Sequence, residues 1–336
     1  MKLEALGEFG LIRRILPHFP SPPEGQVGIG DDCAVLRQGN GEVLLVSTDL
    51  LLENSHFLLD RMRPEDLGYK ALAVNLSDIA AMGGRPTGAL LSLGLPKGLE
   101  VEWLDGFFAG MKELVESAGC PLLGGDTTRS RGGMVINVAV LGVARADEVK
   151  LRSGARPGDV IAVTGVLGDS GNGLNLLLED LPREQADRKR LVEAHVRPRP
   201  HLEEGMWLGK RAEVGGMMDV SDGIDSDLRR MMEQAGVGMR VDLDRLPVSE
   251  ELVRVSGSLG WNVRDLAATA GEDYCLVCTV AEGGFSKVAA DFEARFGRRL
   301  TAIGRVEEGG ELGYRWRGWD TQLAVHGFDH FRENGS

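Results

Sequence analysis

Apolar and polar positions in the first half of the chain follow helical and strand-like periods in turn. A helical pattern runs over Asp66–Met82 and stops at Gly83-Gly84, because glycine readily adopts the left-handed conformation that ends helices. A second helix is predicted for Val101–Ala118, and a short one before the proline-rich segment 17–23. Runs of β-formers predict strands at Glu42–Ser47, Gly88–Leu95 and Met134–Val143.

The second half restarts this alternation after a polar, turn-rich segment, Arg145–Pro157. Such a composition is typical of a linker, so we predict two domains, 1–148 and 149–336. A strand at Val160–Thr164 and a helix at Leu174–Glu179 open the second domain. Further strands are predicted at Met239–Leu243, Tyr274–Val280, Thr301–Val306 and Tyr314–Arg317. Because helices and strands alternate in both halves, the predicted fold class is α/β or α+β.

Composition agrees with an ordinary globular protein. Of 336 residues, 43% are hydrophobic and 26% are charged. No run approaches the ~18 apolar residues that a membrane helix requires. The N-terminus carries acidic residues and lacks the continuous apolar stretch of a secretory signal. We therefore expect a cytoplasmic protein without a membrane partner.

The balance of charge restricts the partners further. The formal net charge is −13, from 51 acidic and 38 basic residues, and no basic stripe interrupts it. Such a chain repels the phosphates of nucleic acids, so no nucleic-acid partner is expected. If the protein binds phosphate-bearing molecules, metal cations have to supply positive charge.

The cysteines do not indicate a metal or redox centre. There are four, too few and too scattered for a disulfide framework. Cys275-x-x-Cys278 lies within the predicted strand Tyr274–Val280, where positions three apart point to opposite faces. We interpret both as core residues.

Aspartates recur at element ends and in glycine-rich loops. A lone aspartate in such a place usually caps a helix or forms a turn, and each one taken singly fits that interpretation. Several share apolar or glycine neighbours, which caps do not need and which draw a carboxylate into the protein. The set comprises Asp31, Asp32, Asp49, Asp78, Asp126, Asp219 and Asp222.

Asp78 gives the clearest indication of a metal. It lies in the apolar helical run Ala71–Met82, with no basic residue within one helical turn. A carboxylate buried there is costly without a cation or several hydrogen-bond donors. Oxygen ligands, with few histidines and cysteines nearby, favour Mg²⁺ over Zn²⁺.

Well-known nucleotide-binding motifs are missing from the sequence. The nearest Gly-Lys pair, Gly209-Lys210, does not belong to a Gly-x-x-x-x-Gly-Lys-Ser/Thr motif. The segment Gly168–Gly173 follows a strand and precedes a helix, where its amides could hold a phosphate or form a structural turn.

These loops, in this order, resemble thiamine-monophosphate kinases, a family of the superfamily that includes aminoimidazole ribonucleotide synthetase. The resemblance covers nearly the whole chain. Single loops such as GDD are shared across the superfamily, whereas the N-x-HF, NLSDIAAMG and GGDTTR stretches together are specific to the kinase. The matching stretches include GIGDDCAVL (28–36), STDLLLENSHF (47–57), YKALAVNLSDIAAMGG (69–84), GGDTTRS (124–130), DVSDGIDSDL (219–228), GEDY (271–274) and GFDHF (327–331).

The resemblance implies a two-domain, PurM-like fold and a homodimer. The N-terminal domain would bind ATP and metal and would complete a β-barrel with that of a second subunit, and the C-terminal domain would complete the site. By resemblance, several Mg²⁺ ions would be held by Asp32, Ser47, Thr48, Asp49, Asp78, Asp126, Asp219 and Asp222. ATP would contact Gly125, Asp126, Arg152 and Ser221. Thiamine monophosphate would contact His56, Glu272 and Phe328, the last a tyrosine in some relatives, whose hydroxyl contact would be lost here.

The implied reaction is in-line transfer of the γ-phosphoryl group of ATP to thiamine monophosphate, giving thiamine diphosphate and ADP. A phosphate monoester has a second pKa of about 6, so the nucleophile is already largely dianionic and needs no general base. Mg²⁺ would offset the repulsion between the two anions. Taken without the family, Arg152 could equally be a surface arginine, His56 is favoured as a packing residue, and Glu272 could cap a strand.

Other functions remain open at this point. One is another ATP-using enzyme of the superfamily, such as a selenophosphate synthetase, a purine-pathway ligase or a hydrogenase-maturation protein. Selenophosphate synthesis needs a reactive cysteine in a mobile N-terminal segment, whereas the first cysteine here is Cys33. Another is a non-catalytic sensor that binds Mg²⁺ and nucleotide.

Overall fold

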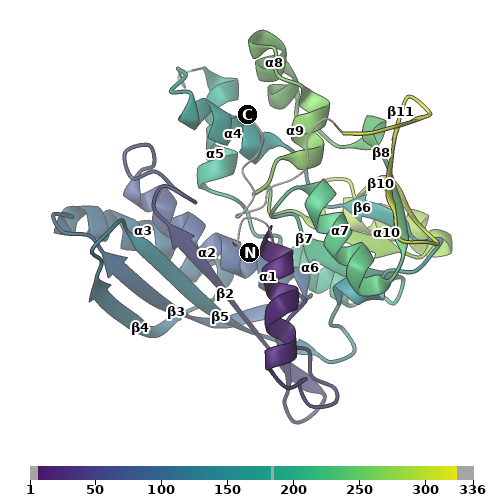
Figure 1. Cartoon of the computed structure of the whole chain (residues 1–336), viewed down its shortest axis with the longest axis horizontal. Coiled ribbons are helices and arrows are strands. Elements are labelled where there is room, and N and C mark those ends of the chain that lie inside the picture. Colours follow the sequence, from purple (N-terminus) through teal and green to yellow (C-terminus); the bar gives the residue numbers. More distant parts are fainter. Residues whose placement is uncertain (1–6, 183–184, 324–336) are drawn as a thin grey trace.

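The computed structural model describes residues 7–182 and 185–323, which fold around two sheets (Figure 1). The first sheet is five-stranded, in the order β1-β2-β5-β3-β4. All neighbouring strands are antiparallel except β3 and β4, which are parallel. Its strands are β1 (Ala34–Arg37), β2 (Glu42–Leu52), β3 (Arg85–Leu95), β4 (Leu122–Arg129) and β5 (Val135–Arg145).

Helices α2 (Pro64–Ala81) and α3 (Val101–Ala118) pair with each other, and α2 packs on β2 and β5 of the first sheet. Pro64 and two acidic residues open α2, as the helix N-terminus favours. Two glycines allow the helices to touch. A Cβ on Gly68 would lie 1.8 Å from the Phe107 carbonyl oxygen, and one on Gly110 would lie 1.7 Å from that of Glu65.

The second sheet is seven-stranded, in the order β12-β11-β8-β10-β6-β9-β7, with β11 and β8 its parallel pair. Its strands are β6 (Val160–Val163), β7 (Val214–Asp219), β8 (Gly238–Asp242), β9 (Leu276–Val280), β10 (Thr301–Glu307), β11 (Leu312–Trp316) and β12 (Trp319–Thr321). The helices of this half are α4 (Asp169–Leu178), α5 (Ala186–Val196), α6 (Leu202–Gly209), α7 (Ile224–Ala235), α8 (Glu250–Leu259), α9 (Val263–Thr269) and α10 (Glu282–Phe296). Short 3₁₀ turns occur at η2 (Leu16–His18), η3 (Arg152–Gly154) and η4 (Leu243–Arg245).

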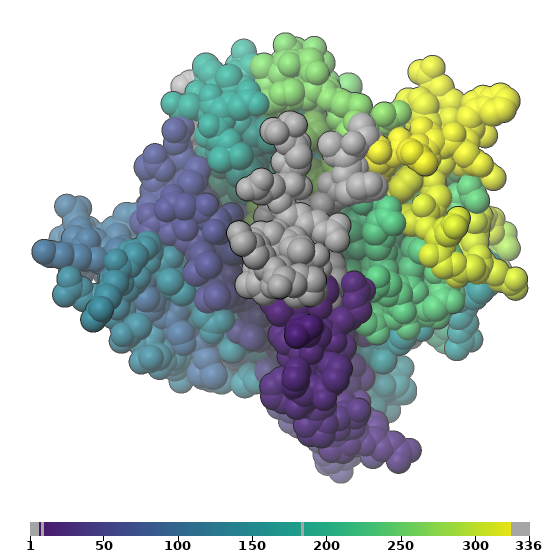
Figure 2. Space-filling view, viewed as in Figure 1, coloured from purple at the N-terminus to yellow at the C-terminus, as the bar shows by residue number. Residues whose placement is uncertain are grey.

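Helix α1 (Gly7–Ile15) contacts the second half of the molecule. It lies across the front of the structure in both views, drawn in purple (Figures 1 and 2). Arg13 of α1 pairs with Glu233 of α7 at 3.4 Å. Among the described residues, no helix has the length and apolar character to cross a membrane.

The two halves meet along α2. Ala80 and Ala81, at its C-terminal end, belong to the same buried cluster as Met217 of β7 and Leu276 of β9. Ser77, one turn earlier, donates a hydrogen bond to Asp219 at the end of β7 (2.6 Å). An aspartate of the second sheet is thereby fixed beside the helix that carries Asp78.

Most elements predicted from the sequence are confirmed, including the helices at 66–82 and 101–118 and the mixed α/β class. The predicted helix Leu174–Glu179 starts earlier, at Asp169, because Gly168 adopts φ 87° just before it. Strands β1, β4, β7 and β12 and helices α5 to α10 were not predicted. Cys275 and Cys278 are buried free thiols, as expected for core residues. The domain boundary at 148/149 stays a prediction.

Candidate functional site

Three aspartates from distant parts of the chain converge on one point. Asp32 lies in the loop before β1, Asp78 on α2 and Asp219 at the end of β7. Each offers a carboxylate oxygen, and these oxygens all lie within 4.8 Å of one another. We call these three residues the aspartate cluster.

Hydroxyl groups orient the aspartate cluster from neighbouring positions. Ser47 of β2 donates to Asp78 Oδ2 at 2.5 Å, and Ser77 of α2 donates to Asp219 Oδ2 at 2.6 Å. Asp32 Oδ2 is buried and accepts no hydrogen bond from any described residue. A buried carboxylate oxygen without a donor is costly unless a cation occupies its lone pairs, so the cluster fits a hard metal ion.

Burial and mutual repulsion disfavour ionisation of Asp78, Asp219 and the adjacent Asp31. Burial, together with Asp32, raises the pKa of Asp219 to about 7. Burial and the neighbouring Asp32 raise the pKa of Asp31 to about 7, although Arg152 opposes the shift. Burial, Asp49 and Asp219 raise the pKa of Asp78 well above its usual range. A divalent cation would reverse these shifts, because it stabilises the charged forms.

Asp49 and Asp222 border the aspartate cluster. Burial raises the pKa of Asp49 to about 6, and Asp222 and then Asp32 contribute by repulsion, which requires all three to be close. The Asp49 backbone N–H donates to Asn75 of α2 at 3.0 Å. The predicted metal ligands Ser47, Asp49 and Asp222 thus lie at the same site as the cluster.

Two partly buried arginines balance part of the negative charge. The Arg152 guanidinium contacts Asp32 and lies 4.0 Å from Asp31, while its backbone N–H donates to Asp31 at 3.1 Å. Arg230 of α7 pairs with Asp222, and with Asp227 at 3.3 Å. The sequence predicted Arg152 as a ligand of ATP but did not indicate Arg230.

Thr48 and Asp126 lie away from the aspartate cluster within one chain. Side chains alternate along β2, so Thr48 points away from the face that carries Ser47 and Asp49, and donates to the Val138 carbonyl at 3.1 Å. Asp126 lies on β4, whose residues are all exposed. Three strand spacings separate β4 from β2, or about 14 Å.

A hollow of about 250 Å³ adjoins Asp126 on the uncovered side of the first sheet, with Ser92 and Asn137 among its walls. Gly125 precedes Asp126 on the same strand. The assignment of Gly125 and Asp126 to ATP therefore stays a prediction that one chain does not test.

The predicted substrate residues His56 and Glu272 are close to each other. His56 Nδ1 accepts the Leu52 backbone N–H at 3.0 Å. Burial opposes ionisation of Glu272, but Lys70, His195 and His56 together lower the pKa of this carboxyl below its usual range. Phe328 lies outside the described residues.

Backbone contacts connect this substrate region to the metal region. The Glu272 N–H donates to the Ser221 carbonyl at 2.7 Å, and the Tyr274 N–H to the Val220 carbonyl at 2.9 Å. Ser221, a predicted ligand of ATP, precedes Asp222 directly. The loops that carry the predicted substrate, nucleotide and metal ligands are therefore linked to one another.

The glycine-rich segment at 168–173 serves a structural purpose. Asp273 accepts the Gly168 N–H at 2.7 Å and the Ser170 N–H at 3.2 Å. These amides are already used at the start of α4, so the turn interpretation is favoured over phosphate binding.

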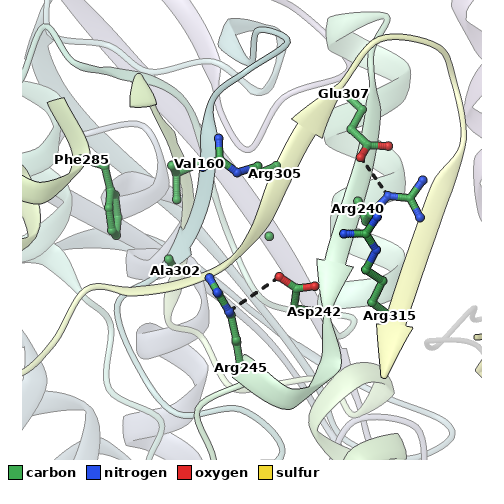
Figure 3. Close-up of a pocket in the computed structure, with 10 residues that line it drawn as sticks. Val160, Arg240, Asp242, Arg245, Phe285, Ala302, Arg305, Glu307 and Arg315 are labelled. Carbon is green, nitrogen blue, oxygen red and sulfur yellow. Dashed lines mark hydrogen bonds and ion pairs between the residues drawn. The ribbon is translucent and has the colours of Figure 1, made fainter. Parts of the chain in front are cut away.

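A further hollow, of about 300 Å³, lies on the second sheet and is lined by residues other than those predicted for the site (Figure 3). Its arginines already face carboxylates. Arg240 pairs with Glu307 at 2.8 Å and Arg245 with Asp242 at 3.7 Å. Because these charges offset one another, the hollow does not compete with the aspartate cluster as the site of phosphate chemistry.

Comparison with known families places two domains on the chain. Residues 30–144 match the AIR synthase related protein, N-terminal domain, and residues 156–317 match the corresponding C-terminal domain. Among curated proteins, thiamine-monophosphate kinase from Salmonella typhimurium is 39% identical over 332 residues, with 94% of this chain and 98% of that protein covered. The Bacillus subtilis protein of the same name is 34% identical over 333 residues, with 97% and 100% covered.

Solved structures give the same result. The structure described as AaThiL complexed with AMPPCP and TMP has a TM-score of 0.85 and 35% identity, and covers 98% of this chain and 99% of its own. The protein tt0281 from Thermus thermophilus has a TM-score of 0.83 at 30% identity, with 96% and 100% covered. Hydrogenase maturation proteins HypE, at 18–23% identity, share the fold.

Proposed function

The chain belongs to the thiamine-monophosphate kinase family, and we propose that it transfers the γ-phosphoryl group of ATP to thiamine monophosphate, giving thiamine diphosphate and ADP. The observation that carries this proposal is the convergence of Asp32, Asp78 and Asp219 within 4.8 Å, beside the loop that bears Glu272 and is hydrogen-bonded to Val220 and Ser221. The AMPPCP and TMP named for one similar structure correspond to an ATP analogue and the acceptor.

Mg²⁺ is the metal that this chemistry favours. The donors are carboxylate and hydroxyl oxygens, and Asp32 Oδ2 is buried without a hydrogen-bond partner among the described residues. Asp32, Asp78 and Asp219 would hold the ion or ions, with Ser47, Asp49 and Asp222 next to them. Bound there, Mg²⁺ would neutralise charge on the phosphoryl oxygens of both reactants.

The residues of the chain supply positioning rather than proton transfer. The acceptor phosphate is largely dianionic near neutral pH, because its second pKa is about 6, and in-line attack needs no base. Arg152 offers a planar set of donors to the phosphates of ATP, as its guanidinium already lies among acceptors of the metal region. His56 and Glu272 would bind the thiamine portion.

A homodimer would complete the site. The uncovered face of the first sheet carries exposed leucines, Leu50 (51%), Leu90 (41%) and Leu123 (57%), alongside Thr48 and Asp126. Apolar side chains gathered on one face are typical of an interface. A second copy packed on this face would cover the leucines, close a β-barrel and supply surroundings for Asp126.

Other superfamily activities are not favoured. Cys33 is buried, with 2% of its surface exposed, and burial followed by repulsion from Asp78 and Asp32 raises the pKa of its thiol well above the usual value. A thiol in that state is a poor nucleophile, which argues against selenophosphate synthesis.

One assay tests the proposed function. Purified protein is incubated with ATP, Mg²⁺ and thiamine monophosphate, and the products are resolved by chromatography. We expect thiamine diphosphate and ADP in equal amounts, and no turnover when EDTA removes the metal. Nucleotide binding by calorimetry without thiamine diphosphate formation would instead identify a sensor and overturn the proposal.

A further inference from the structure

Lys70 is a buried cation at the edge of the proposed substrate site. It lies on α2, and none of its side chain is exposed. A lysine removed from water in this way loses much hydration energy, so its position requires a specific partner. Its neighbours in sequence on this helix, Tyr69 and Ala71, carry no charge that could pair with it. The function described above does not use Lys70.

The partner is Glu272, through a closed ring of three side chains. Lys70 Nζ lies 2.9 Å from Glu272 Oε1 and 3.3 Å from His195 Nε2. His195 Nδ1 lies 3.2 Å from Glu272 Oε2. Each carboxylate oxygen therefore has its own partner, one from α2 and one from α5, and the two partners contact each other.

The ring fixes the tautomer of His195. Lysine has donors only, so His195 Nε2 has to accept and the ring proton resides on Nδ1, which faces Glu272 Oε2. Burial and the Lys70 charge lower the pKa of His195 to about 3, which agrees with a neutral imidazole. The hydroxyl of Ser170 on α4 also lies 3.1 Å from Nδ1, so Ser170 Oγ and Glu272 Oε2 share the Nδ1 proton as acceptors.

The backbone at Glu272 also needs such support. Glu272 has φ 64° and Tyr274 has φ 49°, both in the left-handed region that disfavours residues with a side chain. The hydrogen bonds to Ser221 and Val220 hold this loop against the end of β7. The ring then sets the direction of the carboxylate, whose side chain is 26% exposed.

We propose that Lys70 and His195 are positioning residues that fix the Glu272 carboxylate for the thiamine portion of the substrate. This inference rests on the proposed function. A carboxylate has about four lone-pair sites, of which the ring occupies two, so two remain for a ligand. Lys70 offsets the charge of Glu272, so Glu272 acts on the substrate mainly as an oriented hydrogen-bond acceptor and less as a free negative charge. Such an acceptor suits an amino group.

The first test is Lys70→Met, which keeps most of the length of the side chain and removes its charge. We expect KM for thiamine monophosphate to rise about tenfold while KM for ATP and kcat stay within about twofold, because binding of one substrate is lost uniformly. Glu204→Gln is the matched control: Glu204 is equally buried, and its partners are Arg199 and Arg298. It should lower Tm and leave both KM values unchanged.

A double-mutant cycle separates positioning from general destabilisation. In a Glu272→Gln background the neutral amide no longer needs a counter-cation, so adding Lys70→Met should change KM for thiamine monophosphate less than about twofold. This double variant also leaves no unpaired buried charge, which keeps the test informative if Lys70→Met alone fails to fold. An equal effect of Lys70→Met in both backgrounds would overturn the inference.

His195 gives an independent measurement. His195→Asn keeps an N–H donor near the position of Nδ1, whereas His195→Ala removes it, so only the alanine variant should raise KM for thiamine monophosphate. If the two His195 variants had equal KM values while the wild-type protein still phosphorylated thiamine monophosphate, only the positioning role would be contradicted, and the proposed function would stand. Failure of the wild-type protein to phosphorylate thiamine monophosphate would instead contradict the proposed function.

Discussion

At the scale of single residues, the buried carboxylate of Asp78 connects metal binding to turnover. Its carboxylate is packed on α2 between Asp32 and Asp219, and nearby carboxylates repel it. In Asp78→Asn we predict a turnover at least about 100-fold lower and a higher Mg²⁺ requirement, because the amide is a weaker ligand than the carboxylate. The metal-free variant should unfold at an equal or higher temperature, since one buried charge is gone.

Steady-state rates across a Mg²⁺ titration, with thermal unfolding in EDTA, check this. Asp105→Asn, at an exposed position of α3, is the control and should behave as wild type. Wild-type turnover in Asp78→Asn would remove this residue from the metal site.

At the same scale, Arg152 supplies positive charge to the site, whereas Asp78 supplies negative charge. It contacts Asp32 and approaches Asp31, so it is the counter-cation of the metal-free cluster. Arg152→Met should destabilise the metal-free protein by about 3 kcal/mol, because an uncompensated buried charge remains. Mg²⁺ should restore part of this loss. Urea unfolding with and without Mg²⁺ measures both values, and equal losses under the two conditions would contradict the account.

The residues of the site differ in how far the sequence could reveal them. Asp78 was recognisable because a carboxylate in an apolar helix needs a cation. Lys70 has the same signal, a charge between apolar neighbours, yet its partners His195 and Glu272 lie far away in sequence and have no common motif. Thr48 and Asp126 could not be judged from one chain, because their surroundings depend on which face of the sheet is covered.

At the scale of elements, the approach of α2 and α3 determines where Asp78 lies. A Cβ on Gly110 would lie 1.7 Å from the Glu65 carbonyl oxygen, so Gly110→Ala has to separate the helices. We predict a loss of about 2–3 kcal/mol in unfolding free energy, typical of overpacking. Gly283→Ala on α10, where an added Cβ meets no atom of the described residues within 4 Å, should be neutral or slightly stabilising. Urea denaturation of both variants decides the point.

Elements with regular apolar patterns were predictable, and the others were not. Helix α2 has a long apolar run that is buried on nearly all sides and ends just before Gly83, and α3 has a regular apolar stripe that ends at Gly119. Strand β4 reads LLGGDTTR and is exposed throughout, so it has no alternation of buried and exposed residues to detect. Helix α5 is mostly polar, with Leu191, His195 and Val196 buried, and its pattern resembles a solvated loop.

At the scale of the whole molecule, the uncovered face of the first sheet predicts a dimer. Leu50 is 51% exposed on this face. Leu50→Glu would place a charge in the proposed interface, so we expect a change from dimer to monomer and reduced activity if the partner contributes to the site. Val253→Glu on α8, also exposed at 47%, is the control and should leave the mass unchanged. Sedimentation equilibrium gives the masses, and a monomeric wild-type protein would refute the interface.

The acidic site also couples metal, pH and stability of the whole molecule. Burial and neighbouring carboxylates raise the pKa of Asp31 and of Asp219 to about 7, and that of Asp49 to about 6, from an ordinary value of 3.8. A carboxyl with a raised pKa in the folded state stabilises the fold below its unfolded pKa, and this contribution disappears as pH rises through the folded pKa. The metal-free protein should therefore lose stability between about pH 4 and pH 7.

Mg²⁺ binds the ionised carboxylates, so it should offset this loss of stability at pH values above about 7, where these carboxyls are mostly ionised. We predict a stabilisation by Mg²⁺ of about 2–3 kcal/mol near pH 8, at metal concentrations about 100 times the dissociation constant, and much less near pH 5.5, where protons compete for the same oxygens. Thermal unfolding with MgCl₂ or with NaCl of equal ionic strength, at both pH values, separates binding from screening. An equal stabilisation at the two pH values would mean that the converging carboxylates do not hold the metal. The cost of burying them would then need a different cation, for which Arg152 and Arg230 are the nearest candidates.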